Sequence, residues 1–148
     1  MAIDKLAIEN AHICSKNFSG NTSMYNPTGR RGFTVILDPE TAERLLEEGW
    51  NVKVKDGREE GDPPRYYLDV NVKFDKFPPV VKLVTSNGMT TLDEDTVGQI
   101  DGASVSNCDL IITPYHWEFN GKTGIKAYLK TGYFTIEEDE FAYKYNSL

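Results

Sequence analysis

Residues 111–130 read IITPYHWEFNGKTGIKAYLK and predict a β-hairpin that turns at Asn120-Gly121. Asn-Gly is the strongest short signal for a hairpin, because both residues tolerate the positive φ of a tight turn. Side chains two positions apart in a strand share a face. The first arm therefore groups its aromatic side chains, and the second separates an apolar face from a face that carries lysines. These groups are Tyr115, Trp117 and Phe119 on the first arm, and Ile125, Ala127 and Leu129 against Lys126, Tyr128 and Lys130 on the second.

The pairing of the two arms decides which of these faces is buried. We expect the aromatic group of the first arm to lie beside the apolar face of the second, because Trp and Phe beside Leu and Ile form a good core face. In that register Tyr128 and the lysines are the exposed side chains. The alternative register exposes the aromatic group of the first arm.

An exposed face on which lysines flank an aromatic ring suits a single-stranded nucleic acid. Flat rings stack on bases, and ammonium groups meet the phosphates between them. The solvated face of an ordinary sheet carries the same residue types. The hairpin alone therefore leaves both interpretations open.

Composition indicates one soluble globular domain. The chain has 148 residues, of which 39% are hydrophobic, and a mean hydropathy of -0.47. No run approaches the roughly 20 apolar residues that a membrane helix requires, and residues 1–10 lack the apolar core of a signal peptide. Cys14 and Cys108 do not make a disulfide framework. We therefore expect both thiols to be buried and the protein to be cytoplasmic.

The formal net charge of -7 argues at first against nucleic-acid binding, but the acids are segregated along the chain. They concentrate in residues 137–140 and in a predicted helix that begins at Asp38, whereas basic residues are spread over predicted strands and loops. The distribution of charge matters more than its total. An acidic region separate from a basic face is compatible with nucleic-acid binding, and it also occurs in proteins that bind none.

Turn signals and alternation divide the chain into short strands. We expect strands at residues 6–14, 33–37, 51–55, 65–74 and 80–85 and the hairpin at 109–136, with exposed loops at 15–32 and 56–64. Asp38-Pro39-Glu40 begins a helix, with an N-cap, a proline in the first position and an acid in the first turn, and Gly49 ends it. A second short helix is expected over residues 92–100.

This arrangement predicts a mainly β fold. A Greek-key, OB-like barrel with one or two short inserted helices is the preferred form, and a jelly-roll-like sandwich is the alternative. The helices are too few to cover both faces of a parallel sheet. We expect a single OB-like β domain over residues 1–136, followed by an acidic tail or a short terminal helix over residues 137–148.

No catalytic constellation is recognisable in the sequence. His12 and His116 are far apart and lack metal-ligand spacing, and no nucleophile elbow, phosphate-binding loop or dinucleotide-binding turn occurs. The carboxylates from Glu137 to Glu140 could bind Mg²⁺ for nuclease chemistry, but consecutive acids near a chain end are more often a solvated tail. We therefore expect no enzymatic activity and no cofactor.

Basic and aromatic residues outside the hairpin extend the candidate binding face. Arg30 and Arg31 are adjacent in a glycine-containing loop, and arginine both pairs with phosphates and stacks on bases. Trp50, directly after the first helix, is expected to pack in the core instead. The candidate binding residues are Tyr25, Arg30, Arg31, Lys53, Lys55, Lys73, Tyr115, Trp117, Lys122, Lys126, Tyr128 and Lys130.

Several motifs resemble a group of small bacteriophage proteins. They read YNPTGRRGF at 25–33, LDPETA at 37–42 and EGWNVK at 48–53, and the resemblance continues through residues 114–130 to IEEDE at 136–140. Members of this group are usually treated as phage single-stranded-DNA-binding proteins with an OB-like fold. The resemblance implies this fold and a non-enzymatic role in phage DNA replication or recombination.

The resemblance also implies protein partners. Such proteins commonly end in an acidic tail that contacts replication proteins and competes with DNA. The corresponding acids here are Glu137, Glu138, Asp139 and Glu140. They precede residues 141–148 instead of ending the chain, so the segment is alternatively a terminal helix with Phe141 and Tyr145 packed inward. The sequence leaves a homodimer open, and the rival function is a structural or assembly module that binds no nucleic acid.

Overall fold

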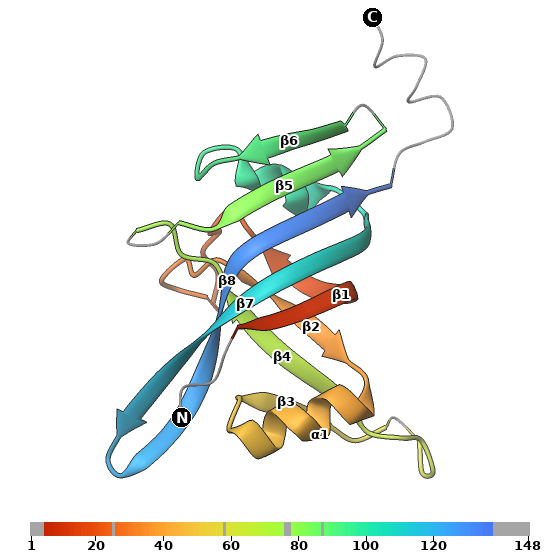
Figure 1. Cartoon of the computed structure of the whole chain (residues 1–148), viewed down its shortest axis with the longest axis vertical. Coiled ribbons are helices and arrows are strands. Elements are labelled where there is room, and N and C mark those ends of the chain that lie inside the picture. The colour runs from red at the N-terminus through yellow and green to blue at the C-terminus, as the bar shows by residue number, and fades with distance from the viewer. Residues whose placement is uncertain (1–4, 25, 58, 76–77, 87, 138–148) are drawn as a thin grey trace, which may run out of the picture.

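The computed structural model describes residues 5–24, 26–57, 59–75, 78–86 and 88–137. These residues form strands, one α-helix and one short 3-10 helix (Figure 1). In chain order the elements are β1 (Leu6–Asn17), β2 (Gly32–Leu37), α1 (Pro39–Glu48), β3 (Val52–Lys55), β4 (Arg65–Asn71), β5 (Val80–Thr85), β6 (Gly88–Leu92), η1 (Val97–Gly102), β7 (Val105–Phe119) and β8 (Lys122–Ile136). No helix in this described part of the chain is long and apolar enough to span a membrane.

Strand pairing closes a ring around the core. β1 pairs with β2, β2 with β4, β4 with β8, β8 with β7, and β7 with β1. Every contact in the ring is antiparallel except the short parallel contact of β4 with β8. β3 extends the sheet beside β4, and the β5–β6 hairpin extends it beside the C-terminal half of β8. The mainly β, OB-like fold expected from the sequence is confirmed.

Large apolar side chains fill the interior of the ring. Phe18, Phe33 and Phe134 are at most 3% exposed, and their ring centroids lie 5.3 to 5.8 Å apart. Aromatic pairs at such distances contribute about 0.5–1.5 kcal/mol beyond the area they bury. Alternation turns every second residue of β2 and β4 into this core. The residues between them form the outer surface of the ring.

Helix α1 begins and ends where the sequence predicts. The Asp38 carboxylate accepts a hydrogen bond from the Thr41 N–H at 3.3 Å, and Pro39 is the first helical residue. This contact satisfies one of the N–H groups that the first turn leaves without a partner. The helix closes at Gly49.

The corner after α1 is fastened to β8. Trp50 is 3% exposed, which confirms that it packs in the core. The Asn51 N–H donates to the Ile125 carbonyl oxygen, and the Ile125 N–H donates to the Gly49 carbonyl oxygen, both at 3.1 Å. The segment that follows the helix therefore pairs with the edge of β8 through a parallel bridge between Trp50 and Ile125.

Residues 113–128, which we call the arm, carry the β7–β8 hairpin away from the ring (Figure 1). Asn120 and Gly121 form its turn with φ values of 51° and 77°, which confirms the predicted turn. In register, Phe119 pairs with Lys122, Trp117 with Gly124, and Tyr115 with Lys126. Directly opposed residues of an antiparallel pair share a face.

This register contradicts the expected core of the hairpin. Ile125, Ala127 and Leu129 are buried as expected, but they lie on the face opposite the aromatic group of the first strand. Tyr115 is 56% exposed and Phe119 is 70% exposed. The expectation that these rings pack in the core is wrong, because a two-residue turn places odd-numbered residues of β7 opposite even-numbered residues of β8.

The region from residue 88 to residue 102 also differs from the expectation. β6 pairs with β5 up to Leu92, and the helix is a 3-10 helix over Val97–Gly102. The Asp93 carboxylate accepts hydrogen bonds from the N–H groups of Asp95 and Thr96 at 2.9 and 3.0 Å, which makes a turn between the two elements. The expected helix over residues 92–100 is therefore too early and too long.

The two cysteines have different surroundings. Cys108 is fully buried and its thiol donates to the Ala11 carbonyl oxygen at 3.3 Å. Burial, together with the nearby Asp109 carboxylate, raises the pKa of Cys108 to about 12. Cys14 is half-buried in β1, so the expectation that both thiols are buried holds only for Cys108.

Candidate nucleic-acid interface

A groove of about 450 Å³ opens on the outer surface where β4 meets β8, and we call it the central groove. Segments far apart in the sequence line it: the loop before β2, the residues that follow β4, the turn after β6 and the root of the arm. The lining residues are Thr28, Gly29, Arg30, Arg31, Asn71, Val72, Lys73, Phe74, Asp75, Glu94, Lys126 and Tyr128. The groove therefore brings together the candidate residues Arg30, Arg31, Lys73, Lys126 and Tyr128.

The parallel contact between β4 and β8 positions the aromatic ring of this groove. Asn71 pairs in register with Tyr128, so both side chains belong to the outer surface, and the Asn71 Nδ2 donates to the Ala127 carbonyl oxygen at 3.1 Å. The Lys73 ammonium lies 5.5 Å from the centroid of the Tyr128 ring. The Tyr115 ring meets Tyr128 edge-on with centroids 5.8 Å apart. Tyr128 thus contacts both a cation and a second ring.

The loop before β2 supplies two arginines. Asn26 orders this loop, because its Nδ2 donates to the Arg30 carbonyl oxygen and its Oδ1 accepts from the Arg30 N–H, both at 3.0 Å. The Arg30 side chain is exposed. The Arg31 guanidinium lies 5.3 Å from the centroid of the Phe74 ring and contacts Glu94. One arginine is therefore open to solvent and the other is fixed against the protein.

The arm continues the outer surface as a row of rings beyond the groove. Tyr115, Trp117 and Phe119 follow one another on the face that also carries Lys122. Trp117 lies against Gly124, where a side-chain carbon would come within 2.6 Å of the indole Cζ2. The indole N–H is buried without a hydrogen-bond partner, so the exposed part of this half-buried ring is apolar. Phe119 was assigned to the core by hydrophobicity alone, and its exposure adds it to the candidate rings.

β3 carries two further lysines on the outer surface. Lys53 forms an ion pair with Asp69, whose carboxylate also accepts from the Thr34 hydroxyl at 2.7 Å. Partial burial raises the pKa of Asp69, but the hydrogen bonds from Lys53 and Thr34 outweigh it, so the pKa is lowered overall. Lys55 lies 5.6 Å from the centroid of the Tyr67 ring. Tyr67 is a further surface ring that the predicted binding residues do not include, although its alternation with the apolar residues of β4 was a visible signal.

Two candidate residues are not part of this assembly. Lys130 is the extra residue of a bulge in β8, exposed to solvent, and the side chain of Lys5 beside it lowers the pKa of Lys130. Tyr25 lies outside the described residues. The structure thus gathers Arg30, Arg31, Lys73, Lys126 and Tyr128 in the groove, continues them along the arm with Tyr115, Trp117 and Lys122, and places Lys53 and Lys55 on the neighbouring strand.

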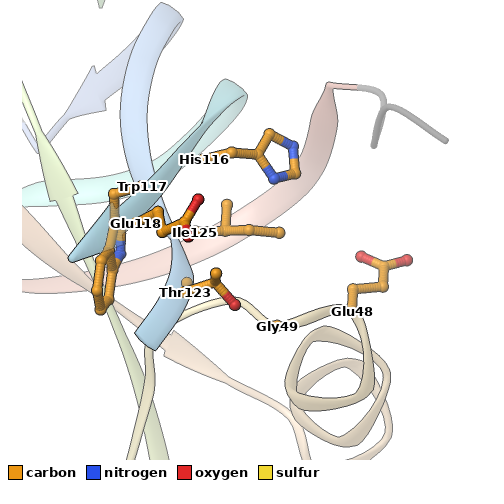
Figure 2. A pocket seen from close by; sticks show the side chains of 8 residues that line it. Glu48, Gly49, His116, Trp117, Glu118, Thr123 and Ile125 are labelled. Carbon is orange, nitrogen blue, oxygen red and sulfur yellow. The ribbon is translucent and has the colours of Figure 1, made fainter. Parts of the chain in front are cut away.

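A second hollow, of about 340 Å³, lies on the reverse face of the arm near the end of α1 (Figure 2). Figure 2 shows His116 and Trp117 on opposite sides of the arm, as alternation requires. Two acids, Glu48 and Glu118, line this hollow, and its lining contains no lysine or arginine to meet phosphates.

Metal binding has no candidate among the residues that the structure describes. No group of three or more His, Cys, Asp or Glu side chains there is placed to hold an ion. The acids that could bind Mg²⁺ according to the sequence are Glu137, Glu138, Asp139 and Glu140, and the last three of these lie outside the described residues.

Comparisons with known proteins identify the family and the fold of the chain. A family model described as "Putative phage ssDNA-binding domain" matches residues 1–148. The single-stranded DNA-binding protein from bacteriophage Enc34 in complex with ssDNA is similar in structure, with a TM-score of 0.56, 11% sequence identity and coverage of 93% of this chain and 89% of that chain. The C-terminal truncation of the Enc34 protein gives a TM-score of 0.55 with 12% identity and coverage of 91% and 87%. No curated protein matches the chain. At these identities the structural similarity shows the fold alone.

Proposed function

This chain belongs to the family of phage single-stranded-DNA-binding domains, and from that premise we propose that it binds single-stranded DNA along the central groove and the arm. The observation that carries this location is the meeting of cations and a ring from segments distant in sequence. Arg30, Arg31, Lys73 and Lys126 line the same groove as Tyr128, and Lys73 lies over the Tyr128 ring. A similar fold was solved with ssDNA in the Enc34 protein, which supports the choice of ligand.

Binding combines stacking with phosphate contacts. Tyr128, Tyr115 and Trp117 offer rings on which bases stack, and each stacked base is worth about 1–3 kcal/mol. Arginine and lysine side chains around them meet the phosphates, so affinity falls as salt rises. Every base has a flat face, and this mode of binding therefore selects weakly among sequences.

The OB-like topology and the ion pair between Lys53 and Asp69 together indicate the path of the DNA strand. OB folds bind oligonucleotides on the outer surface of their second and third strands, between the loop after the first strand and the loop between the last two. In this ring those elements are β2, β4, residues 18–31 and the tip of the arm. Lys53 is already paired with Asp69, so the phosphates run from the groove towards the arm and gain less from β3.

We place the role of the protein in phage DNA replication or recombination, with no catalytic step of its own. Glu137, the first acid of the predicted tail, is exposed and its N–H donates to the Ser104 carbonyl oxygen at 2.7 Å. The acids at 137–140 would contact replication or recombination proteins after the OB-like domain of residues 1–136.

Anisotropy of a labelled oligothymidine tests the proposal with a matched pair of variants. Lys126→Ala and Lys130→Ala each remove one exposed lysine from the same strand, but only Lys126 lines the groove. For the wild type we expect binding that weakens with salt. Lys126→Ala should make the slope of log K against log salt shallower by about 0.7, the value for one phosphate of a single strand.

The outcomes separate the groove from the rest of the surface. An unchanged slope in Lys130→Ala supports the groove as the site. An equal decrease of the slope in both variants would show a diffuse electrostatic effect and contradict the proposed location. Absence of salt-sensitive binding in the wild type would refute the function and favour the structural or assembly module.

A further inference from the structure

Arg31 is a fixed cation in the central groove. Its guanidinium lies 5.3 Å from the centroid of the Phe74 ring, and its Nη1 donates to the backbone carbonyl oxygen of Glu94 at 3.2 Å. The side chain is 23% exposed. A guanidinium held in this way presents its planar fork in one orientation, which suits the bidentate recognition of a phosphate.

The carboxylate opposite this cation is loosely held. The Oε1 of Glu94 lies 3.9 Å from the Nη2 of Arg31, and the Glu94 side chain is 65% exposed. Exposed ion pairs of this length contribute little, because both groups remain well solvated. The Arg31 contact with the backbone of Glu94 does not depend on the carboxylate, so Arg31 keeps its position when the carboxylate moves away.

The ion pair between Lys53 and Asp69, in contrast, has a firmly held carboxylate. Asp69 is held by the Thr34 hydroxyl at 2.7 Å as well as by Lys53, and it is less exposed than Glu94, at 47% against 65%. Asp69 is therefore a fixed partner of Lys53, whereas Glu94 is an exchangeable partner of Arg31. Asp75 also lines the groove but forms no ion pair among the described residues.

We propose that Arg31 is the centre of a phosphate site and that the Glu94 carboxylate occupies this site in the free protein. A phosphate of the bound strand replaces the carboxylate, keeps the contact of Arg31 with Phe74, and leaves Glu94 in solvent. Binding at this point is an exchange of one anion for another, so the net charge gain from Arg31 is small. This inference rests on the proposed function, since it describes how the same groove receives DNA.

The exchange has a consequence for the dependence of affinity on salt. Counting the groove alone, the other cations, Arg30, Lys73 and Lys126, form no ion pair with a described carboxylate, and at about 0.7 per phosphate they give a slope of about -2.1. Between 50 and 200 mM salt, affinity then falls by about 18-fold. With Glu94 neutral, Arg31 joins this set, and the slope becomes about -2.8 with a fall of about 48-fold.

Glu94→Gln tests the exchange, with Asp95→Asn as the matched control. Both substitutions remove one negative charge from neighbouring positions, but Asp95 neither lines the groove nor pairs with Arg31. The measurement is anisotropy of labelled oligothymidine from 50 to 200 mM salt. At the lowest salt we expect Glu94→Gln to bind about two- to fivefold more tightly, the gain from releasing one exposed ion pair, and its slope to be steeper than that of the wild type.

The control decides between a specific and a general effect. Asp95→Asn should keep the wild-type slope if Glu94 acts through Arg31. Equal changes in both variants would reduce the effect to net charge and overturn the inference, as would weaker binding by Glu94→Gln, which would show that the carboxylate positions Arg31 for DNA. Absence of binding by the wild type at any salt would instead refute the proposed function.

Discussion

Replacing Tyr128 with leucine removes the ring at the centre of the groove and leaves every charge in place. The ring is proposed to stack on one base, and one stacked base is worth about 1–3 kcal/mol. The affinity for oligothymidine should therefore fall by about 5- to 160-fold. The slope of log K against log salt should stay at its wild-type value, because the number of neutralised phosphates does not change.

The same substitution also lowers the free energy of unfolding. Tyr128 loses the edge-on contact with Tyr115 and the cation–π contact with Lys73, at centroid distances of 5.8 and 5.5 Å. Together these contacts contribute about 1–2.5 kcal/mol. A domain of ordinary stability, about 5–15 kcal/mol, stays folded after this loss. Urea denaturation of the free protein measures it independently of binding.

Tyr128→Phe is the control for the role of the ring. It keeps the stacking face and loses only the hydroxyl, so its affinity should be close to that of the wild type. Wild-type affinity in Tyr128→Leu would refute stacking on this residue. A loss as large in Tyr128→Phe as in Tyr128→Leu would attribute the effect to the hydroxyl, and a shallower slope in Tyr128→Leu would show that the groove itself had been disturbed.

Two further predictions follow from the tryptophans and from the ion pair beside the groove. Trp117 is half-buried on the arm and Trp50 is buried, so DNA should quench the fluorescence of Trp50→Phe, in which Trp117 remains, but not that of Trp117→Phe. Absence of quenching in Trp50→Phe would place Trp117 outside the interface. The lowered pKa of Asp69 stabilises the fold above the unfolded pKa of aspartate, about 3.9, and this contribution is lost as pH falls through the folded value. Asp69→Asn should therefore cost about 0.2–1 kcal/mol at pH 7, because solvent screens this half-exposed pair, and the cost should shrink as pH falls through the folded pKa of Asp69. Urea denaturation that shows the same cost throughout the acid range would contradict the assignment.

The local elements were predictable because their signals are local. The cap at Asp38, the helix end at Gly49 and the turn at Asn120-Gly121 each depend on a few neighbouring residues. The short run after β6 was misjudged for the same reason. Val97 and Ile100 have helical spacing, but Asp93 forms a turn with the residues that follow it and delays the helix.

The register of the hairpin was predictable and was nevertheless predicted wrongly. A two-residue turn at Asn120-Gly121 fixes Phe119 opposite Lys122, and the parity of every later pair follows. Hydrophobicity suggested the opposite pairing, because it assigned aromatic residues to the core by type. Turn geometry is the stronger constraint, since a slip of one residue in the pairing would move every side chain of one strand to the other face of the hairpin.

The central groove could not be derived from the sequence in the same way. It depends on the parallel contact of Asn71 with Tyr128, between residues 57 positions apart, and on the approach of Glu94 to Arg31, residues 63 positions apart. No local pattern encodes such contacts. The candidate residue types were visible in the sequence, but the meeting of four segments in one groove is a property of the closed ring.

The register of the arm explains how a chain with a net charge of -7 presents a surface for DNA. Alternation places Lys122 and Lys126 on the face with the exposed rings, whereas Glu118 lies on the reverse face, which α1 approaches with Glu48. One hairpin therefore separates cations from acids across its own thickness. A phosphate near the first face is closer to the lysines than to these acids, and screening over about 8 Å at physiological salt weakens the more distant repulsion. The total charge consequently says little about the proposed site, and the local arrangement of charge on the arm favours the approach of DNA to the face that carries the lysines.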